Sequence, residues 1–108
     1  MRATDQTYFE YNHPVKVSAE SGELLGTGHF VGEAGINHRT GVSKWSGNLD
    51  TDIDPLLLVQ GGELRLEFEN GVGYARCPSA NITAHSGSDA LFLVMLRGQG
   101  EPPRVDAD

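Results

Sequence analysis

The sequence has one cysteine, Cys77, and lacks any apolar run approaching the roughly 20 residues that a membrane-spanning helix needs. A lone thiol cannot form an intramolecular disulfide or a cysteine-based zinc site, and it is more typical of a reducing compartment than of secretion. The amino-terminal residues also lack the apolar stretch of a secretion signal. We therefore expect a cytoplasmic protein without a membrane segment.

Basic residues are also scarce. Eight lysines and arginines stand against 15 aspartates and glutamates, which gives a formal net charge of −7. A field of this sign repels phosphate backbones and anionic lipid surfaces unless a local basic patch overrides it. The composition therefore disfavours general binding to nucleic acids or membranes.

Helical periodicity is nearly absent, because the 14 glycines and 5 prolines interrupt almost every amphipathic window. Short stretches with strand-like alternation recur between turn residues, and they predict about eight short strands. A chain of 108 residues is long enough for one hydrophobic core. We expect one all-β domain over residues 1–108, a small antiparallel β-barrel or sandwich, with residues 98–108 as a flexible tail.

The strands can be placed approximately by their alternation and by the turn residues between them. Residues 32–37 are expected to form a loop. The expected strands cover residues 8–11, 15–19, 24–31, 40–49, 63–69, 72–77, 80–84 and 90–96.

The most regular stretch is 63–69, where charged and apolar residues alternate strictly before Asn70-Gly71. This dipeptide favours a two-residue hairpin turn. Such a turn would place Arg65 opposite Arg76, and like charges in that position are destabilising. A longer loop is therefore the alternative.

Residues 90–96 are apolar on both faces, unlike the other strands. If the even-numbered residues fill the core, the odd-numbered ones form an outer strip: Leu91, Leu93 and Met95. An outer apolar strip favours association, although the amino-terminal segment or a helical turn could also cover it. The first functional hypothesis is a non-enzymatic protein-interaction module without a cofactor, which forms a homodimer through this strip.

The alternative hypothesis is a ligand-binding barrel. Arg65, Tyr74 and Arg76 could share an exposed face that offers stacking and anion contacts to a nucleotide, although a solvated hairpin face would look the same. Trp45, the single tryptophan, would be a contact residue at a ligand site or an anchor of the core.

Asp50, Asp52 and Asp54 reproduce the first three ligand positions of an EF-hand calcium loop. The sixth position, which requires glycine, is Pro55, and the twelfth, which requires glutamate, is Gly61. The three acids therefore fit either a calcium site of another type or an acidic turn before a buried strand of leucines.

The segment Asn81 to Gly87 resembles the D/N-x-S-x-x-G motif of PilZ domains, small β-barrels that bind cyclic di-GMP. In that family an upstream R-x-x-x-R pair holds the ligand. Here Thr83 replaces the serine, Gly87 falls one residue late, and the sequence contains no R-x-x-x-R. The resemblance extends only to the barrel class, and it implies nucleotide binding as one form of the ligand-binding hypothesis.

Catalytic patterns are weak. The two-residue turn would bury Cys77 on the inner face, where a thiol is inert because its thiolate is scarce. The histidines lie in four separate segments without the spacing of a local zinc site: His13, His29, His38 and His85.

Overall fold

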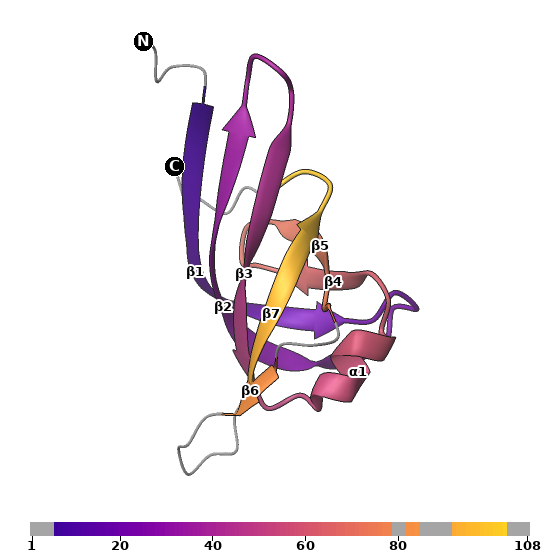
Figure 1. The fold of residues 1–108 in the computed structure, drawn as a ribbon. Helices are drawn as coiled ribbons and strands as arrows, with labels where there is room; N and C mark the ends of the chain where they lie inside the picture. Colours follow the sequence, from indigo (N-terminus) through magenta and orange to yellow (C-terminus); the bar gives the residue numbers. More distant parts are fainter. Residues whose placement is uncertain (1–5, 79–81, 85–91, 104–108) are drawn as a thin grey trace.

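A computed structural model describes residues 6–78, 82–84 and 92–103 (Figure 1). These residues form a closed antiparallel barrel of six strands, with a seventh short strand and one short helix. The all-β class is thus confirmed as a barrel, with one strand fewer than expected. The elements are β1 (Gln6–Ser18), β2 (Leu24–Asn37), β3 (Ser43–Thr51), α1 (Pro55–Gln60), β4 (Leu64–Glu67), β5 (Val72–Arg76), β6 (Ile82–Ala84) and β7 (Phe92–Gln99).

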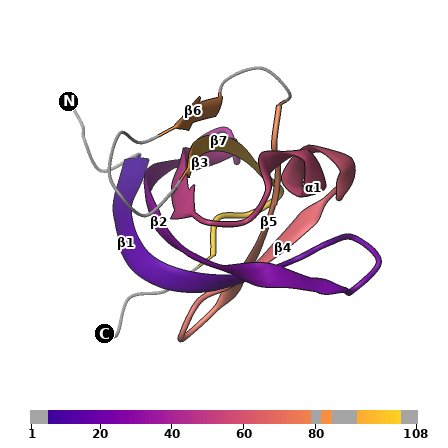
Figure 2. The same ribbon diagram turned by 90° about the horizontal axis from the view of Figure 1, so that it is seen from below.

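The barrel closes because β7 pairs with β3. The strand order is β3-β2-β1-β4-β5-β7, and β7 returns to β3 to complete the ring seen along its axis in Figure 2. On its other edge, β7 pairs with β6 near its start and with β5 near its end. Two consecutive strands therefore share one side of β7.

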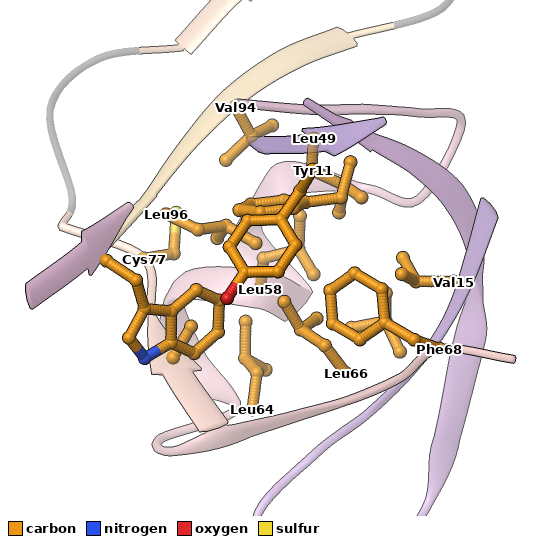
Figure 3. Packing of buried hydrophobic residues seen from close by; sticks show 14 of the residues in the cluster. Tyr11, Val15, Leu49, Leu58, Leu64, Leu66, Phe68, Cys77, Val94 and Leu96 are labelled. Carbon is orange, nitrogen blue, oxygen red and sulfur yellow. The ribbon is translucent and has the colours of Figure 1, made fainter. Parts of the chain in front are cut away.

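The core combines a cluster of aromatic side chains with buried aliphatic residues from β4 and β7. Tyr11 lies at its centre, with ring centroids 5.8 Å from Phe30, 6.0 Å from Trp45 and 5.6 Å from Phe68. Figure 3 shows the rings of Tyr11 and Phe68 side by side. Small residues on β5 and β7 leave room beside these rings: Gly73 and Gly98 lie against Trp45, and Ala75 is buried.

Two of the expected strand boundaries are wrong. The first two expected strands form one continuous strand, β1, and residues 32–37 continue β2 instead of forming a loop. Pro14 does not break β1 because the ladder to β4 begins only at Lys16, so its missing N–H costs no bond on that side.

The leucines after the acidic segment form a helix rather than the expected buried strand. Pro55 fits the first turn of a helix, and Asp54 caps it by accepting a hydrogen bond from the Leu56 N–H at 3.0 Å. Leu58 is completely buried, whereas Leu56 is 61% exposed. The short helix therefore turns one apolar face, which carries Leu58, toward the core and leaves Leu56 on the surface.

The carboxyl-terminal segment is anchored well beyond the expected start of the tail. Strand β7 runs to Gln99, and Pro102 and Pro103 are buried. The Tyr11 hydroxyl donates a hydrogen bond to the Pro103 carbonyl at 2.8 Å. Residues 98–103 are therefore part of the packed structure and not of the expected flexible tail. The rest of that expected tail, residues 104–108, lies outside the described residues.

A side chain at Gly98 should destabilise the barrel. A Cβ at this position would lie 2.2 Å from the Trp45 indole. We expect Gly98→Ala to lower the free energy of unfolding by about 1 to 3 kcal/mol through overpacking, as measured by urea denaturation. Gln99→Ala, on the next residue of β7, is the control, and an equal loss in both variants would contradict the packing account.

Candidate functional site

The hairpin between β4 and β5 has a longer loop than two residues. Glu67 pairs with Val72, and the Phe68 N–H donates to the Gly71 carbonyl at 2.8 Å. The two-residue register is therefore wrong, and the longer loop is correct. As a result Arg65 lies opposite Tyr74 instead of Arg76.

The outer surface of β4, β5 and β7 gathers arginines around a tyrosine. Tyr74 lies between Arg65 on β4 and Gln99 on β7, and Arg76 lies directly opposite Arg97. We call these five residues the cationic face. The sequence predicted that Arg65, Tyr74 and Arg76 share a face, and the register agrees, but Arg97 and Gln99 were missed.

The positive charge of the cationic face is only partly neutralised. Arg65 lies 3.8 Å from Glu67, and both side chains are nearly half exposed, so this ion pair is weak. Arg76 and Arg97 are exposed, and neither forms a salt bridge within the part of the chain that the structure describes. Like charges directly opposite each other on a sheet are destabilising, and a bound anion would relieve this repulsion.

Trp45 supports the cationic face from the inside and does not contribute to its surface. The side chain is 3% exposed, and its indole lies against Gly98. In β7, Gly98 is the residue between Arg97 and Gln99, two members of the cationic face. Its Nε1 has no hydrogen-bond partner among the described residues. Trp45 is therefore an anchor of the core, not a contact residue of an exposed ligand.

A groove of about 510 Å³ opens where β1 and β4 diverge, beside the β4–β5 loop. Phe68 and Val15 form its apolar floor, but Glu67 and Glu69 flank it with only Lys16 to offset them. Two carboxylates disfavour an anion, so the groove is a weaker candidate than the cationic face for a phosphate-bearing ligand.

The three aspartates predicted as a metal site lie in three different local environments. Asp50 lies half-buried on β3, Asp52 is exposed, and Asp54 caps α1. No group of three potential metal-ligating side chains occurs among residues 6–78, 82–84 and 92–103. The arrangement fits the acidic turn, with a helix in place of the expected strand.

The capping role of Asp54 can be measured directly. Asp54→Ala removes the acceptor of the Leu56 N–H and should lower the free energy of unfolding by about 1 kcal/mol. Asp52→Ala, two residues before the capping residue, should change it by less than about 0.5 kcal/mol. Stabilisation by calcium that both substitutions abolish would instead favour a metal site.

The outer strip expected on the last strand is present as far as the structure describes it. Val94 and Leu96 are completely buried, Leu93 is half-buried, and Met95 is 40% exposed. Leu91 lies outside the described residues. The alternation of inner and outer residues is therefore as expected.

The residues considered for catalysis do not converge in the described structure. His13 packs against Phe68, and His29 and His38 bond to Asn12 and Thr7 respectively. His85 and most of the segment resembling PilZ domains lie outside the described residues, apart from residues 82–84 in β6. Cys77 is 8% exposed beside Leu96 (Figure 3), and this burial raises the pKa of its thiol.

Cys77 should react slowly with thiol reagents while the protein is folded. Because desolvation raises its pKa above 9.0, the thiol stays neutral in the folded state at pH values where the unfolded thiol ionises. Stability should therefore be unaffected by this group below pH 9.0 and should fall as the pH rises above it. Chemical denaturation at pH 7 and 10, compared between the parent and Cys77→Ala, measures this contribution. Rapid labelling of the native thiol at neutral pH would contradict its burial.

Comparison of the chain with protein-family models, curated proteins and solved structures found no match. Within the described residues, no helix has the length and apolarity needed to span a membrane.

Proposed function

We propose that this barrel is a non-enzymatic binding module that holds a nucleotide on the cationic face. The observation that carries the proposal is the direct opposition of Arg76 and Arg97 without an acidic partner among the described residues. A phosphate placed between two guanidinium groups accepts charge-assisted hydrogen bonds from both. It also removes the repulsion between them.

The aromatic ring of Tyr74 supports a ligand that has a planar base. Tyr74 is 43% exposed and lies one cross-strand position from Arg65 and diagonal to Arg97. An exposed ring of this kind stacks on a base with little sequence preference. Arg65 and Gln99 on either side can donate hydrogen bonds to the base or the sugar.

The overall charge favours a small ligand over a polynucleotide. The formal net charge of −7 repels a long phosphate backbone, whose charges extend beyond the local arginines. A mononucleotide or dinucleotide places its few phosphates entirely within the cationic face. The proposal is therefore binding of a free nucleotide, without chemical conversion of it.

Thermal unfolding with adenosine and guanosine monophosphates and triphosphates tests the proposal. A nucleotide at a hundred times its dissociation constant should stabilise the folded state by about 2.7 kcal/mol. Ribose 5-phosphate, which lacks the base, and adenosine, which lacks the phosphate, should each bind at least about tenfold more weakly.

Two substitutions locate the site. Arg76→Gln should remove the phosphate contact, and Tyr74→Leu should remove base stacking worth about 1 to 3 kcal/mol. Arg39→Gln removes the same charge from the exposed turn between β2 and β3, and it should leave nucleotide affinity unchanged. Equal losses in Arg76→Gln and Arg39→Gln, or equal affinities for a nucleotide and ribose 5-phosphate, would refute the proposed site.

A further inference from the structure

A second surface lies on the outer face of β2, β3 and β7, which run side by side in Figure 1. The strand register aligns one residue from each of β2, β3 and β7, so the outward side chains form two rows that cross β3. We call this surface the two-row face. The first row is Glu33, Ser46 and Arg97, and the second is Val31, Asn48 and Met95.

The first row changes sign across β3. A carboxylate lies on the β2 side, a small hydroxyl lies on β3, and a guanidinium lies on the β7 side. Beyond Glu33, Glu10 of β1 extends the negative side, and beyond Arg97, Arg76 of β5 extends the positive side. The row is therefore antisymmetric about β3.

We propose that a second copy of this chain docks on the two-row face, with a two-fold axis that lies in the interface and runs along β3. Rotation about such an axis exchanges the positions of β2 and β7. Glu33 of each copy then faces Arg97 of the other, and Val31 faces Met95. This inference does not depend on the proposed nucleotide binding.

The side-chain lengths fit this arrangement. Ser46 and Asn48 lie on the axis and are short, so the two β3 strands can approach each other. Glu33 and Arg97 lie on the flanking strands, where the barrel curves away, and they are long enough to bridge the wider gap. Val31 and Met95 are 50% and 40% exposed, so their contact removes apolar surface from water.

The arrangement also explains the two like-charge neighbours on the barrel surface. Glu10 lies directly opposite Glu33, and both are exposed. Such a pair is unfavourable in one copy alone, but it strengthens the attraction for Arg97 and Arg76 of another copy. A complementary second copy therefore offsets both repulsions at once.

The interface is small and its dimer is weak. Lys44 and Asp50 also lie on the outer face of β3, and in a strictly parallel arrangement each would face its own counterpart across the axis. Packed sheets cross at about 30°, so these ends separate and only the central rows make contact. Such a contact falls below about 1,200 Å² of total buried surface, which is typical of transient and salt-sensitive association.

Charge reversal tests the pairing, with association measured by sedimentation velocity without nucleotide. Glu33→Arg and Arg97→Glu each place like charges across the two-fold axis, and each should weaken self-association at least about tenfold. A mixture of the two variants should form a mixed dimer about as tight as the parent dimer, because both of its charge pairs are again opposite. An effect within one chain could not produce this recovery.

Matched controls separate the pairing from total charge. Glu23→Arg and Arg39→Glu make the same charge changes on exposed turns, and they should leave the association constant within about threefold of the parent. A parent that stays monomeric up to roughly millimolar concentration, or a mixture no tighter than the single variants, would overturn the inference. A parent chain that dimerises but binds no nucleotide would refute only the proposed function.

Discussion

The contact of Trp45 with Gly98 is the constraint on which the closed barrel depends. A large indole from β3 occupies the space that glycine leaves on β7, and Gly73 on β5 provides similar room at its far end. A larger residue at either place would press against the indole and force the packing between β3, β5 and β7 to shift. The pairing of β5 with β7 then brings Arg97 and Gln99 beside the arginines and the tyrosine of the β4–β5 hairpin.

Local signals in the sequence were sufficient for the class of fold but not for its longer elements. Strict alternation predicted β4, which has one exposed and one buried face, and the Asn70-Gly71 pair predicted that β5 returns beside it. Pro14 suggested a break in β1, yet proline costs little where the strand has no neighbour on that side. The helix α1 was missed because six residues are too few to show helical periodicity.

Only the residues of the candidate site that lie on the β4–β5 hairpin could be predicted from the sequence. Arg65, Tyr74 and Arg76 lie on adjacent strands of the sequence, so alternation alone placed them on one face. Arg97 joins them through the pairing of β5 with β7, which depends on how the whole ring closes. Long-range strand pairing of this kind leaves no local pattern in the sequence.

Arg97 belongs to both proposed surfaces, so a bound phosphate and a second copy compete for the same guanidinium. The positions of the charges also have a consequence at longer range. Glu10 and Glu33 lie on β1 and β2, whereas Arg76 and Arg97 lie on β5 and β7. These four charges form a local dipole across this part of the surface, and such a field helps to orient an approaching charged molecule before the two touch.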